Sequence, residues 1–393
     1  MDFYQQALML CPQTQAHRRF FHQNAEVGLN MPEAVAYVTR ELKSLGLDPR
    51  SCGHGVTATI GSGRPCILLR ADMDALPMAE ESGEPFACPT KTAAHTCGHD
   101  LHAAMLLTAA AMLCRQQETL QGTVKLMFQS AEETFQGAED MLEAGILRDP
   151  PVDAALSFHV AAGKMPPGLI LYNAEGTMMA SADNFRITIH GKSSHGAYPQ
   201  EAISPIRIAA HLCMALDTLV AEETDPKKMC ILSLGQIHSG TAANIIPDLG
   251  VIEGTLRTDD ENCRQYLLKR IQELARESAR HYGGSSEFTI LSGVPPLVCH
   301  PELTQQMAGF IRELRFPGAG LHAGITANAS EDFARIAAAV PSSFFYLSAG
   351  FADERGNYPA HNPKVRFCED VLPIGAACYA QCAVRWLTAQ ATK

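Results

Sequence analysis

The sequence predicts an α/β protein with a mixed-sheet domain that carries helices on both faces and an inserted ferredoxin-like domain. Its 393 residues exceed the size at which one hydrophobic core usually keeps growing, so two domains are expected. Short apolar runs alternate with helical segments before residue 181 and again after residue 296, which is typical of an α/β sheet. Between these positions the expected order of elements is β-α-β-β-α-β.

The outer domain begins with helices. Residues 1–47 are expected to be helical, because Pro32 stands in a first-turn position and Gly46 marks a helix end. Another helix is expected from 102 to 114. Buried strands are predicted by three apolar runs, at 66–69, 124–128 and 154–158. The alternation resumes after the insertion, with a strand at 343–347.

The inserted domain opens on a strand in which apolar Phe185, Ile187 and Ile189 alternate with polar residues, as in a half-buried antiparallel strand. The elements expected after it are a helix at 205–220, strands at 230–237 and 249–258, a helix around 267–278 and a strand at 288–291. The predicted domains are therefore 1–180 joined with 296–393, and 181–295 between them.

Composition excludes several classes of function. The formal net charge of -11 disfavours nucleic acid and anionic membrane surfaces as partners. The longest apolar stretch, 101–113, is shorter than the roughly 20 residues that span a bilayer, and no signal peptide is visible. The 13 cysteines include no CxxC pair, which favours free thiols in a reducing compartment. We therefore expect a cytoplasmic protein.

Four segments place acidic, histidine or cysteine residues just after an expected strand or in a loop; they are 70–77, 95–100, 129–133 and 158–160. Ligands bind beyond the carboxyl ends of parallel strands, so these residues can meet. Cys97 and His99 offer a thiol and an imidazole, Glu133 offers a carboxylate, and His159 offers a second imidazole. Such ligand types suit borderline divalent metals such as zinc. Each residue alone also fits a packing, turn or surface role, but the joint pattern favours a metal site.

The adjacent pair Glu132 and Glu133 has its own interpretation. If the segment is extended, adjacent side chains point to opposite sides. One carboxylate can then bind metal while the other takes a proton from the attacking water. That division of roles is typical of a hydrolase.

The motifs that carry chemistry run through nearly the whole chain. They are ADMDALP (71–77), HTCGHDLHAAM (95–105), SAEE (130–133), FHV (158–160), GKSSHGAYP (191–199), GTAANIIPD (240–248), GTLRT (254–258), SEDF (330–333) and AHNPKVRF (360–367). As an ordered set they resemble the aminoacylase and carboxypeptidase superfamily of dinuclear metallohydrolases. Within it, the chain is similar to the branch of hippurate hydrolase and indole-acetyl-amino-acid hydrolase.

The resemblance implies two divalent metal ions, with zinc, manganese, cobalt and nickel as the candidates. The implied ligands are Cys97, His99, Glu133, His159 and His361. Glu132 would be the general acid and base, and Asp74 would orient a ligand. Asp72 stands where other branches have a metal-binding histidine, so it is not counted as a ligand.

The resemblance also implies that the inserted domain is a lid through which two copies form a homodimer. His195 would reach the partner subunit's active site and stabilise the developing oxyanion. Asn244 and Arg257 would contact substrate, Arg257 through a bidentate pair with its carboxylate. Taken singly, these three also fit a surface histidine, a turn residue and a structural ion pair. His102 is interpreted as a packing residue at a helix start.

The predicted function is metal-dependent hydrolysis of the amide bond of N-acyl amino acids, such as N-acetyl or N-benzoyl compounds, to a carboxylic acid and a free amino acid. A dipeptidase or carboxypeptidase with the same dinuclear site is the alternative within the enzymes. A catalytically silent binding or regulatory protein on this fold is the alternative from another class.

Overall fold

The computed structural model describes residues 2–318 and 320–391, which fall into two compact units. The first unit is built from Met1–Met178, Val298–Thr326 and Asp332–Lys393. The second unit is built from Met179–Leu297 and Ala327–Glu331. The first unit is therefore discontinuous in sequence, and the second is inserted into it. No described helix combines the length and the hydropathy needed to cross a membrane.

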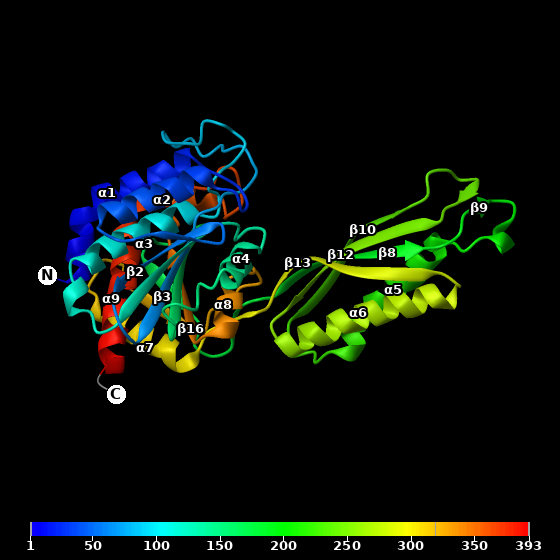
Figure 1. The fold of residues 1–393 in the computed structure, drawn as a ribbon. Helices are drawn as coiled ribbons and strands as arrows, with labels where there is room; N and C mark the ends of the chain where they lie inside the picture. The colour runs from blue at the N-terminus through cyan, green and yellow to red at the C-terminus, as the bar shows by residue number, and fades with distance from the viewer. Residues whose placement is uncertain (1, 319, 392–393) are drawn as a thin grey trace. The chain divides into compact units, whose positions relative to one another are not determined.

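The first unit is organised around an eight-stranded mixed sheet (Figure 1). In spatial order its strands are β1 (Arg50–Cys52), β2 (Gly55–Gly61), β4 (Thr123–Gln129), β3 (Cys66–Asp72), β5 (Ala154–Ala161), β16 (Ser342–Ser348), β6 (Leu169–Tyr172) and β15 (Gly320–Ala323). The central strands β4, β3, β5 and β16 are parallel, whereas β2 and β6 run antiparallel to their inner neighbours. Every residue of β3 and β4 is buried, as expected for parallel strands covered on both faces.

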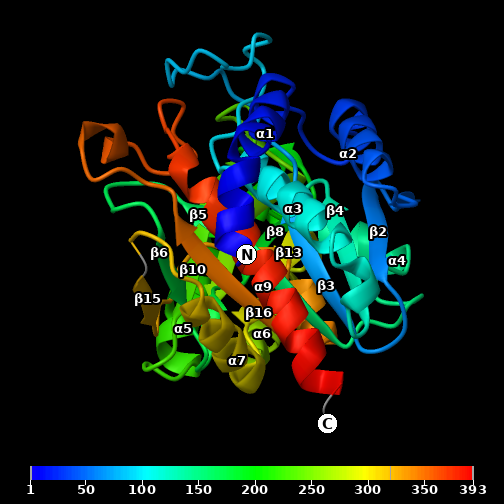
Figure 2. The ribbon, with the colours of Figure 1, turned by 90° about the vertical axis from the view of Figure 1, so that its left-hand side faces the viewer.

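Helices cover both faces of this sheet, as predicted. They are α1 (Phe3–Gln23), α2 (Pro32–Ser44), α3 (His99–Cys114), α4 (Gly137–Glu143), α7 (Pro301–Glu313), α8 (Ala334–Ala339) and α9 (Leu372–Ala391). Helices α1, α3 and α9 contact one another, and α3 and α9 also contact β3 (Figure 2). Helix α3 is therefore buried on nearly all sides. Helices α4 and α8 contact each other and lie on the opposite face (Figure 1).

The second unit has the predicted ferredoxin-like fold. Its elements in chain order are β8 (Ala182–His190), α5 (Pro205–Glu223), β10 (Cys230–Ser239), β12 (Leu249–Thr258), α6 (Glu261–His281) and β13 (Ser285–Val294). The strands form an antiparallel sheet in the order β10-β12-β8-β13. Phe185, Ile187 and Ile189 are buried against α5 and α6, so the alternation of the first strand decides which face is covered.

Candidate metal centre

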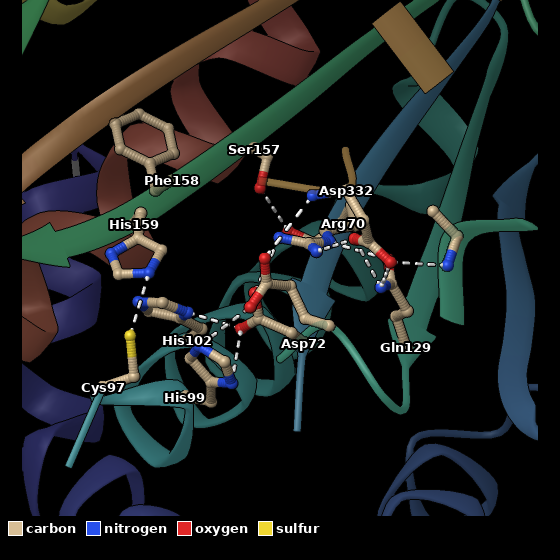
Figure 3. Close-up of polar contacts among 12 residues, drawn as sticks. Arg70, Asp72, Cys97, His99, His102, Gln129, Ser157, Phe158, His159 and Asp332 are labelled. Carbon is tan, nitrogen blue, oxygen red and sulfur yellow. Dashed lines mark hydrogen bonds and ion pairs between the residues drawn. The ribbon is translucent and has the colours of Figure 1, made fainter. Parts of the chain in front are cut away.

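Three neighbouring parallel strands bring distant segments to one edge of the large sheet. Strands β4, β3 and β5 lie side by side in this order. Asp72 ends β3, Glu132 follows β4 within three residues, and His159 lies near the end of β5. Helix α3 starts at His99, directly after Cys97 and Gly98. The carboxyl ends of these strands and the start of α3 therefore surround one buried place (Figure 3).

The five side chains implied as metal ligands lie together in the structure. The Sγ atom of Cys97 is 3.5 Å from Nε2 of His159 and 3.3 Å from Nε2 of His361. The Oε1 atom of Glu133 is 3.4 Å from Nε2 of His361 and 3.9 Å from Nε2 of His99. The five residues supply one sulfur, three imidazole nitrogens and a carboxylate, which is a donor set for a borderline divalent ion.

These donors form two groups that share Cys97. One group consists of Cys97, His99 and His159, and the other consists of Cys97, Glu133 and His361. Within each group the donor atoms lie within 4.8 Å of one another. The sulfur of Cys97 therefore lies where it could bind a metal ion in either group.

Both ring nitrogens of His99 are buried without a hydrogen-bond partner among the described residues. Its ring is fully buried, and its Nδ1 atom is 3.3 Å from Oδ1 of Asp74. Among the described residues its Nε2 atom has no hydrogen-bond partner, although carboxylate oxygens of Glu132 and Glu133 each lie 3.9 Å away. A buried imidazole nitrogen is rarely left unpaired in a native protein. The donor set around His99 therefore fits a metal ion.

The tautomer of His159 is fixed by its own backbone neighbour. Its Nδ1–H donates to the carbonyl oxygen of Val160 at 2.7 Å, which leaves the lone pair of Nε2 facing Cys97. Burial and the nearby His102 hold the pKa of His159 well below its usual range. The ring is therefore neutral, which is the form that binds metal.

Among the other donors, Glu133 is charged, whereas Cys97 has to lose a proton to bind a cation. Burial and the Glu133 carboxylate raise the pKa of the Cys97 thiol to about 12. Binding of a divalent ion requires the thiolate, so it releases this proton. Burial acts to raise the pKa of Glu133, but the hydrogen bond with His361 and the nearby His99 together lower it, so the carboxylate is charged.

His361 reaches the centre from a loop that precedes α9. Its backbone N–H donates to the carbonyl oxygen of Thr96 at 2.9 Å, which ties this loop to the segment that carries Cys97. The backbone of His361 has a φ of 66°, which a non-glycine residue adopts only where the surroundings hold it. The strained backbone brings Nε2 of His361 to Cys97 from 264 residues away in sequence.

Asp74 shapes the turn that carries the two glutamates. Its Oδ1 and Oδ2 atoms accept the backbone N–H groups of Glu132 and Glu133, each at 3.0 Å. Together with a φ of 53° at Ala131, these bonds fold the segment into a tight turn. The expectation of an extended segment with the two side chains on opposite sides is therefore wrong, because both carboxylates approach Nε2 of His99.

The interpretation of His102 as a packing residue is wrong, because both of its ring nitrogens form hydrogen bonds. Its Nε2 atom accepts the backbone N–H of Val160 at 2.7 Å, so that nitrogen carries no proton. Its Nδ1–H donates to Oδ1 of Asp72 at 2.5 Å (Figure 3). Because both nitrogens are used, His102 is excluded as a ligand and instead links the end of β5 to the end of β3. His102 lies three residues after His99 on the same face of α3, and this spacing could have indicated that His102 also lies at the site.

The fully buried Arg70 donates a hydrogen bond to the second carboxylate oxygen of Asp72. Arg70 donates to Oδ2 of Asp72 at 2.7 Å, to Gln129 at 3.0 Å and to Asp332 at 3.0 Å (Figure 3). Burial acts to raise the pKa of Asp72, but Arg70 and the neighbouring histidines hold it well below its usual range. Both oxygens of Asp72 are thus occupied by protein donors. Arg70, Gln129 and Asp332 lie within the segments and motifs taken from the sequence, but no role was predicted for them.

The second unit separates its three implied substrate residues. His195 lies in β9 (Ser194–His195), which pairs with β11 (Ile245–Ile246), and the carbonyl oxygen of Asn244 accepts the N–H of Gly196 at 2.8 Å. His195 and Asn244 are therefore neighbours beyond one end of the four-stranded sheet (Figure 1). Arg257 lies at the other end of β12, where it donates to the carbonyl oxygen of Asn328 at 3.2 Å.

Known proteins resemble this chain over nearly its whole length. The profile of peptidase family M20/M25/M40 matches residues 68–385. The IAA-amino acid hydrolase ILR1-like 2 of Arabidopsis thaliana is 37% identical over 386 residues, which cover 96% of this chain and 85% of that protein. The thermostable carboxypeptidase 2 of Saccharolobus solfataricus is 33% identical over 383 residues, which cover 94% of each chain.

A solved structure extends the likeness to the whole fold. A dinuclear metal-binding peptidase of the M20 family from Bacillus subtilis matches with a TM-score of 0.81 and 28% identity, over 97% of this chain and 99% of that one. The profile match, the relatives and the buried donor set lead to the same conclusion. This chain belongs to peptidase family M20/M25/M40 and is a hydrolase that acts on amide bonds.

Proposed function

We propose that this chain hydrolyses the amide bond of N-acyl amino acids at a pair of divalent metal ions. The observation that carries the proposal is the pair of three-donor groups that share the sulfur of Cys97, with a further carboxylate, Glu132, beside them. The relative of 37% identity is a hydrolase of amino acid conjugates, which supports the N-acyl class of substrate.

Cys97, His99 and His159 would hold one ion, and Cys97, Glu133 and His361 would hold the other. Zinc, manganese, cobalt and nickel all accept this mixture of sulfur, nitrogen and oxygen donors. When bound, such ions polarise the scissile carbonyl and make water acidic enough to attack it near neutral pH.

Glu132 would move the proton. Its Oε1 atom accepts the backbone N–H of Asp332 at 3.4 Å, and its Oε2 atom faces His99 at 3.9 Å. The carboxylate is 5% exposed and is not needed in either group that shares Cys97. Oε2 of Glu132 would take the proton from the attacking water and pass it to the leaving amine. Asp74 would hold Glu132 in place through the turn that it caps.

The lid residues support a homodimer as the active species. Arg257 lies eight residues along β12 from Leu249, which is roughly 26 Å at about 3.3 Å per residue. His195 lies beyond the Leu249 end, because Leu249 pairs with His190 and the chain continues from there to β9. One small substrate cannot span this distance. We therefore propose that Arg257 and Asn244 act with substrate from different copies, with His195 and Asn244 supplied together by the partner.

This arrangement predicts complementation between two inactive variants. His195→Ala and Arg257→Ala should each lower activity strongly when they are produced alone. When both are produced in one cell with different tags, the mixed dimers contain one site with both residues intact. We expect the mixture to recover about a quarter of wild-type activity, since half of the dimers are mixed and each has one intact site. Activity of the mixture no higher than that of either variant would exclude the shared site.

A carboxypeptidase or dipeptidase activity at the same centre is the second candidate, and it rests on the relative from Saccharolobus solfataricus. The chemistry at the amide is the same, so only the groups on either side of it differ. A panel of N-acetyl amino acids, N-benzoyl amino acids and dipeptides separates the two candidates by kcat/KM. We expect the N-acyl compounds to be preferred. A clear preference for dipeptides with a free amino group would replace the first proposal by the second.

A further inference from the structure

Two cysteines in the second unit lie in direct contact although 33 residues separate them in sequence. Cys230 is the first residue of β10, and Cys263 lies in the first turn of α6. Their Sγ atoms are 3.1 Å apart, about 1 Å more than the ~2.05 Å of a disulfide bond. In the part of the chain that the structure describes, this is the one contact between two cysteine sulfurs.

The backbone on both sides of this pair is held by other contacts. Cys230 pairs with Thr258 across β10 and β12. The N–H of Cys263 donates to Oδ1 of Asp260 at 2.8 Å, and Oδ2 of Asp260 forms an ion pair with Nζ of Lys228 at 2.7 Å. The ion pair between Lys228 and Asp260 therefore holds together the segments that precede the two cysteines. These backbone and side-chain contacts hold the two thiols face to face, and none of them depends on a bond between the two sulfurs.

We propose that Cys230 and Cys263 form a reversible disulfide bond when the protein meets a small-molecule disulfide such as glutathione disulfide. Both side chains are partly exposed, so a small oxidant can reach the pair. Cysteine pairs that oxidise reversibly in reducing compartments commonly have such access. Among the described residues, no other pair of cysteine sulfurs is in hydrogen-bonding contact.

The exchange proceeds in two steps. Either cysteine can attack first once it has lost its proton to solvent, and the same two steps result when Cys230 does so. The Cys230 sulfur bonds to one sulfur of the small disulfide, whose S–S bond breaks and releases one small thiolate. Cys263 then loses its proton to solvent, and its sulfur attacks Sγ of Cys230 and expels the second small thiolate. The protein gives up two electrons and two protons, and the small disulfide gains them as two thiols.

The disulfide bond would link α6 covalently to β10, an edge strand of the four-stranded sheet. It closes the segment 230–263, which contains β10 and β12 and with them Asn244 and Arg257. A cross-link across a segment of this length restricts the unfolded chain and stabilises the folded one. The oxidised lid is therefore expected to resist thermal unfolding better than the reduced lid.

The test uses the full chain with its metal bound, incubated with glutathione disulfide and then acid-quenched and alkylated. We expect the intact mass to fall by two hydrogens, two fewer thiols to be alkylated, and a cross-linked peptide to join Cys230 with Cys263. Dithiothreitol should reverse all three changes, and the oxidised protein should unfold at a temperature several degrees higher.

Variants give the matched comparison. Cys230→Ser and Cys263→Ser should each abolish the cross-linked peptide and the gain in thermal stability. Cys213→Ser, at a partly exposed cysteine of α5 in the same unit, should leave both unchanged. If the wild-type chain yields only glutathione adducts, or a cross-link between other cysteines, the proposal is wrong, and this result does not depend on how the variants fold.

Discussion

Glu132→Gln should lower kcat for an N-acyl amino acid by roughly 10²–10⁴-fold while the metal content stays near that of the wild type. Glutamine has the same shape as glutamate, and its side-chain oxygen can still accept the N–H of Asp332. It cannot accept a proton from water at neutral pH, so only the proton transfer is lost. Steady-state kinetics and elemental analysis of the same sample measure the two quantities.

Two comparisons sharpen this experiment. Glu133→Gln should lose metal as well as activity, because Glu133 belongs to one of the donor groups. Glu139→Gln, at an exposed glutamate of α4, should change neither. Near wild-type turnover by Glu132→Gln would remove Glu132 from the proposed mechanism and leave another base to be found.

Cys97→Ser should remove metal and activity together. The Cys97 sulfur lies 3.5 Å and 3.3 Å from the nearest nitrogens of His159 and His361, and both donor groups include it. A serine hydroxyl is a poor ligand, because it does not ionise readily and its oxygen is harder than sulfur. We expect less than the wild-type number of bound ions and a loss of at least about 100-fold in kcat/KM, consistent with the role of metal in activating water.

The matched control is a buried thiol far from the donor groups. Cys299→Ser places a hydroxyl at a site that is 1% exposed, so it should lower the free energy of unfolding but leave the metal content unchanged. If Cys97→Ser behaved in the same way, with full metal and full turnover, the shared sulfur would not be a ligand.

The strands could be predicted from the sequence where burial on one face or on both faces decides which side chains are apolar. Strands β3, β4 and β5 are continuous apolar runs because helices cover both faces of the sheet, and the alternation in β8 follows from an open face. Strand β2 was missed, although buried Val56, Ala58 and Ile60 alternate with Thr57 and Thr59. Its apolar residues alternate with threonines, so the strand lacks the continuous apolar run that marked the central strands.

Two features of the candidate site could not be read from local sequence. The turn at Glu132 depends on Asp74, which lies 58 residues earlier and caps the N–H groups of both glutamates. The role of His102 depends on Asp72 and on the N–H of Val160, which arrive from two different strands. Polar contacts of this kind are set by tertiary structure and have no period of their own in the sequence.

A pair of metal ions at Cys97 is proposed to drive amide hydrolysis. The most direct measurement removes metal with a chelator, and then follows hydrolysis of an N-acetyl amino acid as zinc, manganese, cobalt or nickel is added back in known amounts. We predict almost no turnover without metal and a rise that saturates at two bound ions per chain, one for each donor group that shares Cys97. Full turnover by the metal-free chain, or full turnover with a single ion bound per chain, would contradict a catalytic pair of ions at Cys97.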